Sequence, residues 1–308
     1  LPTDVELQTD PSVAGSAGIL NVVSRDWDAG AIGSLGLSCD QLPAVQEVDR
    51  PAGRLSAARA CGLPAGTPVA VPIGDHQASF LGSVADRHSS VLLNVGTGAQ
   101  VAVFTNNTVF SPPVELRPFP IQGNLLSNVG LTGGWSFQVV ESFVRQLGVT
   151  LFSADSDHAV YDQLTALASQ ADADCGGLRC VPTFSGTRSH PLQTGSFDCI
   201  TPHSLTPANF ARAVLNGMAE NYRVAWNQIL EITGPTATAP TLVGAGNGLR
   251  ENPELVAAVA RQFGSVAMVT AHREEAAFGA ALVGGVSAGV FASLDEAGQL
   301  VRHQSLCG

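Results

Sequence analysis

The stretch PIGDHQAS, residues 72–79, places the carboxylate of Asp75 between a glycine and a run of small and polar residues. The apolar run before it, VAVPIG (69–74), predicts a buried strand, and HQASFLGSVA (76–85) predicts a helix. Ligands gather where buried strands of α/β sheets end, so we interpret Asp75 as a general base that accepts a proton from a substrate hydroxyl. Its position fits a second role equally well, as the N-cap of the following helix.

A second glycine-rich turn lies in SVLLNVGTGAQVAVFT (90–105), where Gly96, Thr97 and Gly98 join two β-branched runs. This pattern predicts a hairpin. Glycines let a backbone approach an anion closely, and Thr97 would add a hydroxyl, so the turn suits a terminal phosphate.

A third turn, LVGAGNGLREN (242–252), follows a predicted strand and carries Gly244, Gly246 and Asn252. The glycines would admit an adenosine diphosphate, and Asn252 would lie near its phosphate or ribose. One such turn is typical of any α/β protein. Three in one chain favour a nucleotide site.

Strand and helix patterns alternate in the last third of the chain, which predicts an α/β fold with helices packed on a parallel or mixed sheet. The predicted strands are 241–246 and 265–270, and the predicted helices are 207–233, 252–263 and 274–285. Thr206 would cap the helix 207–233, Pro207 suits its first turn, and Gly234 would end it. Apolar residues at helical spacing predict that this helix faces the core: Phe210, Val214, Met218, Trp226 and Ile229.

An earlier helix is predicted over 135–148. Trp135, Val139, Phe143 and Leu147 recur at four-residue intervals on one face, and Gly148 supplies a stop signal.

Composition excludes several function classes. The chain has a formal net charge of −11, and all 15 of its basic side chains are Arg. An acidic chain without basic clusters is a poor binder of nucleic acid or anionic membranes. A P-loop needs a Lys, so any nucleotide must be held by backbone N–H groups, hydroxyls, Arg or a metal ion. We expect no metal site built from protein side chains.

The six cysteines are expected to be free thiols of a cytoplasmic protein, since the first ten residues have neither a basic nor an apolar segment typical of a secretory signal. Zinc binding by the pair Cys175 and Cys180 is the weaker alternative, because no second pair matches it.

The order GD-x-Q-A, N-x-G-T and G-x-G followed by EEAAFGAAL resembles the FGGY carbohydrate kinases, which have the actin-like ATPase (ribonuclease H-like) fold. Three further segments support the resemblance: TDPSVAGSAGILNVVSRDWD (9–28), LTGGWSFQVVESFV (131–144) and GTRSHP (186–191), in which Thr187 stands where the family usually has Glu. Within the family, GDHQASF, VLLNVGTGAQVAVF and VGAGNGLREN are most similar to the sedoheptulokinase branch.

The resemblance implies an ATP- and Mg²⁺-dependent transfer of phosphate to a ketose, sedoheptulose giving its 7-phosphate. It implies that Asp75 is the catalytic base and that His76 and Gln77 contact the sugar. The phosphate and nucleotide contacts would be Gly96, Thr97, Gly98, Gly133, Gly134, Gly244, Gly246 and Asn252. Sugar and ATP are the expected partners, and the sequence is silent on oligomeric state.

The resemblance also implies two domains: the remainder of an N-terminal FGGY domain over 1–85 and a C-terminal, nucleotide-binding domain over 86–308. The family's opening Asp-x-Gly-Thr-Thr hairpin has no match, so we expect the first domain to be incomplete and these 308 residues alone to be a weak catalyst or none. The alternatives are an FGGY kinase for xylulose, ribulose or glycerol, a nucleotide-binding fragment without activity, and an actin-like ATPase of chaperone or filament type.

Overall fold

The computed structural model describes residues 7–56, 62–154, 159–188, 190–234, 240–265 and 268–305. The chain divides into two compact units. Unit 1 comprises Leu1–Leu92, Ala102–Ser127 and Thr270–His303, and unit 2 comprises Leu93–Val101, Asn128–Val269 and Gln304–Gly308.

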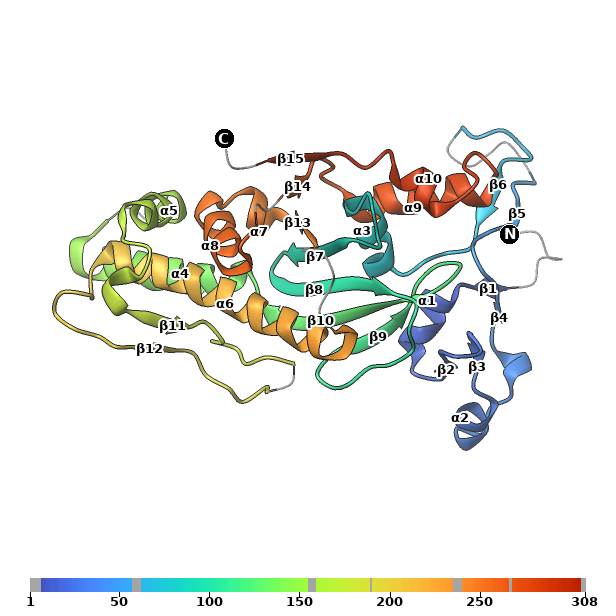
Figure 1. Cartoon of the computed structure of the whole chain (residues 1–308), viewed down its shortest axis with the longest axis horizontal. Coiled ribbons are helices and arrows are strands. Elements are labelled where there is room, and N and C mark those ends of the chain that lie inside the picture. Colours follow the sequence, from blue (N-terminus) through green and yellow to red (C-terminus); the bar gives the residue numbers. More distant parts are fainter. Residues whose placement is uncertain are drawn as a thin grey trace. The chain divides into compact units, whose positions relative to one another are not determined.

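A seven-stranded sheet has the order β15-β14-β13-β7-β8-β10-β9 (Figure 1). Its strands are β7 (Ser90–Val95), β8 (Gly98–Thr105), β9 (Glu115–Pro118), β10 (Asn124–Thr132), β13 (Thr241–Ala245), β14 (Met268–Thr270) and β15 (His303–Ser305). β13 and β14 are parallel, whereas β9 and β10 are antiparallel, so the sheet is mixed as predicted. The predicted hairpin is confirmed, because Gly96 and Thr97 alone separate the neighbouring strands β7 and β8.

Unit 1 contains short strands in pairs and the helices around them. β1 (Gln8–Thr9) pairs with β4 (Ala44–Val45), β2 (Leu20–Asn21) with β3 (Asp26–Trp27), and β5 (Pro51–Arg54) with β6 (Pro68–Ala70). Its helices are α1 (Pro11–Ala14), α2 (Ala29–Ser34), α3 (Asp75–Ser83), α9 (Glu275–Ser287) and α10 (Leu294–Gly298), with 3-10 turns at η1 (Gly15–Ala17) and η2 (Cys39–Gln41).

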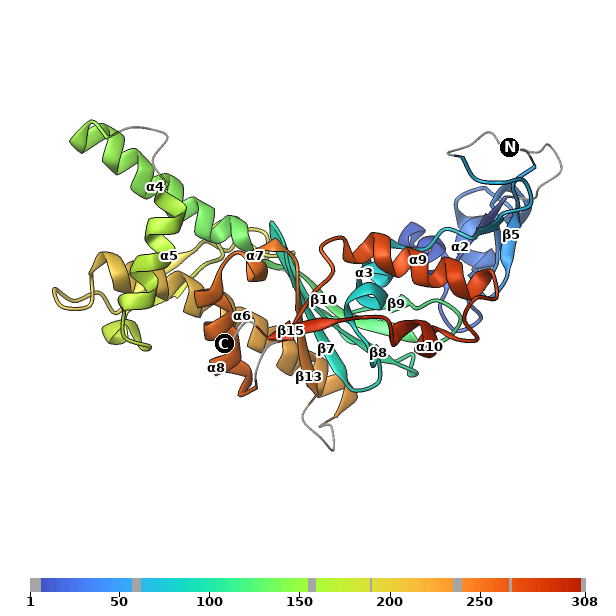
Figure 2. The ribbon, with the colours of Figure 1, turned by 90° about the horizontal axis from the view of Figure 1, so that it is seen from above.

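Helices α3 and α9 lie side by side in unit 1 (Figures 1 and 2). Gly82 on α3 and Gly279 on α9 permit a very close crossing. A Cβ atom at Gly82 would overlap the Glu275 carbonyl, and one at Gly279 would overlap the Ala78 carbonyl. Only glycine fits at these two positions, and the crossing holds the helix that begins with Asp75.

The predicted strand at VAVPIG is wrong for its second half. β6 ends at Ala70, is half-buried to exposed and pairs only with β5, outside the large sheet. Pro72 has no N–H to donate to a strand ladder, so the chain leaves the strand before the turn. Asp75 therefore follows an irregular segment and not a buried strand.

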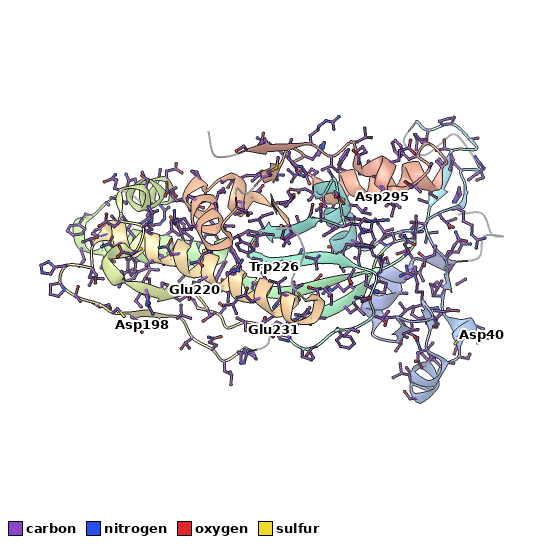
Figure 3. The ribbon with its side chains drawn as sticks, viewed as in Figure 1. Asp40, Asp198, Glu220, Trp226, Glu231 and Asp295 are labelled. Atoms are coloured by element: carbon purple, nitrogen blue, oxygen red, sulfur yellow. The ribbon has the colours of Figure 1, made fainter. Side chains whose placement is uncertain are left out.

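Unit 2 is built around α6 (Pro207–Thr233), whose predicted bounds are confirmed. Thr206 caps it through a hydrogen bond from the Asn209 N–H, and Gly234 follows its end. Val214, Met218, Trp226 and Ile229 are buried. Figure 3 shows α6 with Trp226, Glu220 and Glu231 labelled; both carboxylates are exposed.

The other elements of unit 2 are α4 (Gly134–Phe152), α5 (Val160–Gln170), η3 (Cys175–Gly177), β11 (Arg179–Val181), β12 (Ser196–Asp198), α7 (Asn247–Arg250) and α8 (Pro253–Phe263). β11 and β12 form an antiparallel pair. The predicted helices 252–263 and 274–285 correspond to α8 and α9, and the strands 241–246 and 265–270 to β13 and β14; residues 266 and 267 lie outside the described part.

Helix α4 differs from its prediction at its end and on its faces. It continues past Gly148 to Phe152 and ends where Ser153 adopts a left-handed conformation (φ 52°). Its buried residues are Ser136, Phe137 and Val140, whereas Trp135, Phe143 and Leu147 are exposed. Spacing alone identified an apolar face, but packing within unit 2 uses the neighbouring one.

Cys39, Cys175, Cys180 and Cys199 are free thiols, and Cys61 and Cys307 lie outside the described residues. Burial raises the pKa of the Cys180 thiol to about 12. In the described part of the chain, no helix has the length and apolar character needed to cross a membrane.

Candidate active site

The first turn of α3 in unit 1 presents Asp75. Gly74 occupies the N-cap position, so the alternative of Asp75 as the N-cap is wrong. The Asp75 side chain is exposed, and its Oδ1 accepts a hydrogen bond of 2.7 Å from the N–H of His76. An exposed carboxylate at a helix start is favoured by the helix dipole and remains open to a substrate hydroxyl.

The next two side chains point into unit 1. His76 and Gln77 are 6% and 2% exposed. His76 Nε2 lies 2.9 Å from Ser127 Oγ on β10, and Gln77 Nε2 donates to the Pro118 carbonyl on β9 at 2.8 Å. These bonds anchor α3; the predicted sugar contacts of both residues stay predictions.

Unit 1 also contains a buried carboxyl, that of Asp10. Asp10 is 0% exposed, and its Oδ1 accepts from the Ser12 N–H at 2.8 Å as the N-cap of α1. Among the described residues its Oδ2 has no hydrogen-bond partner. Burial raises the pKa of Asp10 to about 6, because the charged form loses hydration that its hydrogen bonds from Ser12 only partly replace.

We expect Asp10→Asn to become more stable relative to wild type as pH rises. The Asp10 carboxyl has a higher pKa in the folded protein than in the unfolded chain, so its protonated form stabilises the fold. Wild type loses this stabilisation as pH rises from the unfolded pKa of 3.8 to the folded pKa of about 6. Asn keeps the cap acceptor but has no charge to bury. Between pH 5 and 7.5 the difference in unfolding free energy should grow by about 1 kcal/mol. Urea unfolding of both proteins measures it; a constant difference would contradict the raised pKa.

In unit 2, the predicted phosphate turn interlocks with the start of α4. Gly96, Thr97 and Gly98 are exposed. The N–H of Gly134 donates to the Gly96 carbonyl at 2.9 Å. A Cβ atom at Gly133 would lie 2.5 Å from the carbonyl oxygens of Thr97 and Gly98, so this position requires glycine.

The third turn packs on the end of β7, within the same unit. Gly246 has φ 85°, and a Cβ atom there would overlap the Val95 carbonyl. Gly244, by contrast, is buried in β13 against Leu249 and Val269. Three backbone turns, around Thr97, Gly133 and Gly246, therefore lie together in unit 2, although about 40 and 110 residues separate them along the chain.

Asn252 is 1% exposed and serves α8. Its Oδ1 accepts from the Leu255 N–H at 3.0 Å, and its Nδ2 lies 3.4 Å from the Tyr161 hydroxyl. Asn247, the first residue of α7, is an exposed polar side chain at this turn. The sequence analysis did not predict a role for Asn247. Its position directly after Gly246, at the end of a predicted strand, was the available signal.

Family models match both parts of the chain. The FGGY family of carbohydrate kinases, N-terminal domain, matches residues 3–82, and the C-terminal domain of the same family matches residues 91–288. The chain belongs to the FGGY family. The predicted boundary between domains at residues 85 and 86 stays a prediction.

Relatives of this FGGY chain include the autoinducer-2 kinase of Yersinia enterocolitica, 30% identical over 97% of this chain and 58% of that protein. The autoinducer-2 kinase of Escherichia coli K12 is 29% identical over 97% of this chain and 57% of its own length. The chain thus spans less than two thirds of these relatives. The sedoheptulokinase resemblance is not among these names and stays a prediction.

Solved structures confirm the actin-like sugar kinase fold. Xylulose kinase from Rhodospirillum rubrum superposes with a TM-score of 0.83 at 23% identity, covering 97% of this chain and 59% of that one. Plasmodium falciparum glycerol kinase with ADP superposes with a TM-score of 0.78 at 17% identity, covering 95% of this chain and 57% of that one. At these identities the likeness establishes the fold.

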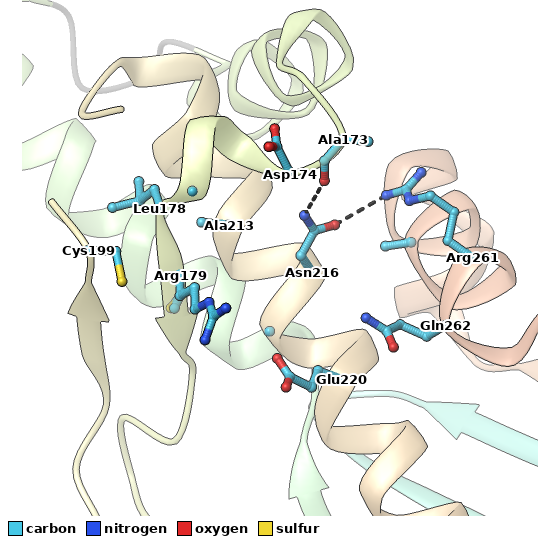
Figure 4. Close-up of a pocket in the computed structure, with 14 residues that line it drawn as sticks. Ala173, Asp174, Leu178, Arg179, Cys199, Ala213, Asn216, Glu220, Arg261 and Gln262 are labelled. Atoms are coloured by element: carbon cyan, nitrogen blue, oxygen red, sulfur yellow. Dashed lines mark hydrogen bonds between the residues drawn. The ribbon is translucent and has the colours of Figure 1, made fainter. Parts of the chain in front are cut away.

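The FGGY chain also has a cavity of about 620 Å³ in unit 2, away from the turns (Figure 4). Asn216 on α6 bridges two of its walls, donating to the Ala173 carbonyl at 2.9 Å and accepting from Arg261 Nη2 at 3.1 Å. None of the predicted nucleotide contacts lines it. Its lining is Ala173, Asp174, Gly177, Leu178, Arg179, Cys180, Cys199, Ala213, Asn216, Gly217, Glu220, Ala258, Arg261 and Gln262.

Proposed function

We propose that the protein containing this chain is an ATP-dependent carbohydrate kinase in which Asp75 is the general base. A sugar hydroxyl gives its proton to the Asp75 carboxylate as its oxygen bonds to the γ-phosphorus, and the bond from that phosphorus to ADP breaks. The observation that carries this proposal is the exposed carboxylate on the first turn of α3, in a chain of the FGGY family. The test is the Asp75→Asn variant treated in the Discussion.

We assign nucleotide binding to the interlocked turns of unit 2. The exposed backbone at Gly96–Gly98 would contact a transferring phosphate, and Asn247 beside Gly246 would contact the rest of the nucleotide. The predicted contact by Gly134 stays a prediction, and its N–H already donates to the Gly96 carbonyl. Asn252 would act indirectly, by holding the start of α8. The ADP named with the glycerol kinase structure belongs to that protein and supports adenosine nucleotides as the first to test.

We expect Gly133→Ala to weaken ADP binding by at least about tenfold, because an added Cβ would displace the turn at Thr97. Calorimetric titration of the chain with ADP measures the change. Gly148→Ala is the matched control: it lies in the same helix, α4, and its Cβ would meet only Ala154 at an ordinary 3.5 Å. If both variants bind ADP with equal affinity, the turn at Thr97 is not part of the nucleotide site.

Magnesium fits this arrangement as an ion carried with the nucleotide. The described residues contain no group of three or more His, Cys, Asp or Glu that could hold a metal ion by themselves. Mg²⁺ usually keeps several waters and is bound largely through substrate phosphates, so it needs no dedicated cage of protein side chains. When bound, the ion would neutralise charge on the phosphates.

For the sugar we propose sedoheptulose, phosphorylated at its 7-hydroxyl. The support is the motif set GDHQASF, VLLNVGTGAQVAVF and VGAGNGLREN. The names of the relatives offer autoinducer-2, xylulose, gluconate and glycerol as competitors. ATP-dependent turnover of all five by the complete protein decides among them: the highest kcat/KM should belong to sedoheptulose, and a preference for autoinducer-2 would overturn the substrate while keeping the reaction.

A further inference from the structure

A buried hydroxyl in unit 1 reaches the backbone directly before Asp75. Ser12, in α1, is 3% exposed, and its Oγ accepts a hydrogen bond of 2.9 Å from the Gly74 N–H. Residues 62 positions apart are joined by this bond. Ser12 is itself held, because its N–H donates to Asp10 Oδ1 at 2.8 Å.

Gly74 sets the course of the chain into α3. It is the N-cap, in an extended conformation (φ −64°, ψ 140°), and its carbonyl accepts from the Ala78 N–H at 2.9 Å. A Cβ atom at Gly74 would overlap the Gln77 side-chain oxygen and lie 3.3 Å from the Ser12 carbonyl. The turn is thus fitted closely to the Ser12 segment.

The other anchors of this helix start act after Asp75 and not before it. His76 is bonded to Ser127 and Gln77 to the Pro118 carbonyl, both through side chains. Before Asp75, the start of the helix is held by the hydrogen bond that the Gly74 N–H donates to the Ser12 hydroxyl. The direction in which the Asp75 carboxylate projects therefore depends on Ser12.

We infer that Ser12 is a positioning residue for the base Asp75: its hydroxyl, by accepting the Gly74 N–H, holds the backbone from which the carboxylate projects. This inference rests on the proposed role of Asp75. Proton transfer requires hydrogen-bond distance between base and substrate, and a displacement of about 1 Å can cost about 10²-fold in rate.

The test compares steady-state kinetics of four variants of the complete protein: Ser12→Ala, Ser12→Thr, Asp75→Asn and Ser83→Ala. Ser12→Ala should lower kcat about tenfold with the KM for ATP unchanged, and Ser12→Thr, which keeps the hydroxyl, should restore most of it. Ser83 is the matched control: it ends α3, is 0% exposed, and its hydroxyl has no partner among the described residues. Ser83→Ala should leave kcat unchanged.

A double variant separates positioning from general stability. If Ser12 acts through Asp75, adding Ser12→Ala to Asp75→Asn should lower the residual rate by less than twofold, although each change alone is costly. A full further tenfold loss would overturn the inference, as would an unchanged kcat in Ser12→Ala. If Ser12→Ala fails to fold, Ser12→Cys keeps a similar volume with a weak acceptor and takes its place.

The outcomes distinguish this inference from the proposed function. An active Asp75→Asn would remove the base itself, and the Ser12 inference with it. An inactive Asp75→Asn beside a fully active Ser12→Ala would keep the base and reject only the positioning role.

Discussion

Asp75→Asn should reduce kcat of the complete protein by about 10²–10⁴ while leaving ADP affinity unchanged. The substitution preserves the shape of the side chain and its acceptor oxygen for the His76 N–H, but an amide cannot take up the sugar proton. Since the predicted nucleotide contacts lie in unit 2 and Asp75 in unit 1, binding and transfer should separate cleanly. Phosphoryl-transfer kinetics and calorimetric titration with ADP measure the two effects.

Asp295→Asn provides the matched control for this experiment. Asp295 is also an exposed carboxylate in the first turn of a helix of unit 1, α10. It forms an ion pair with Arg87 at 3.2 Å, in which the side chain of Asp295 is 57% exposed and that of Arg87 is 9% exposed. Turnover should be unaffected. Near-normal turnover in Asp75→Asn would contradict the assignment of the base, and an equal loss in both variants would point to a general effect of charge.

Gly279→Val should destabilise the fold by about 3 kcal/mol or more, the upper range for overpacked cores. The added atoms would overlap the carbonyl of Ala78, and a helix backbone cannot turn aside as a flexible side chain can. Relief requires α3 to move away from α9. Urea unfolding gives the free energy directly, and a large loss of soluble protein on expression would be the extreme form of the same result.

Gly284→Ala tests whether this effect comes from the crossing and not from any change of glycine in α9. Gly284 lies in the same helix, and a Cβ atom there meets nothing within 4 Å. This variant should be more stable than wild type by about 0.5–1 kcal/mol, because alanine has less freedom to lose on folding. An unfolding midpoint of Gly279→Val equal to wild type would contradict the close packing of α3 on α9.

Several features followed from local sequence because their causes are local. Thr206, Pro207 and Gly234 specify the two ends of α6 through capping, a preset φ and a glycine at a positive φ of 75°. The two residues between β7 and β8 specify their hairpin. The candidate base could be predicted because a short motif carries it. The FGGY family models match residues 3–82, which include this motif, and residues 91–288, in agreement with the resemblance.

Other features depend on contacts between distant segments, which periodicity does not encode. The apolar face Trp135, Phe143 and Leu147 of α4 is as regular as that of α6, yet packing left it exposed. Asn252 reads as a ligand from the sequence, but its amide caps α8. Burial is decided by which surfaces meet, and a linear pattern names only the surfaces available.

The amino-acid sequence by itself thus determined the α/β class, the order of the glycine turns and the candidate base Asp75. Only the tertiary structure decided that Gly133 supports the turn at Thr97, that Gly82 and Gly279 bring two helices into contact, and that Ser12 bonds to Gly74. The physical reason is range: turn and cap preferences act within a few residues, whereas close backbone packing and buried hydrogen bonds join segments that meet only once the chain is folded.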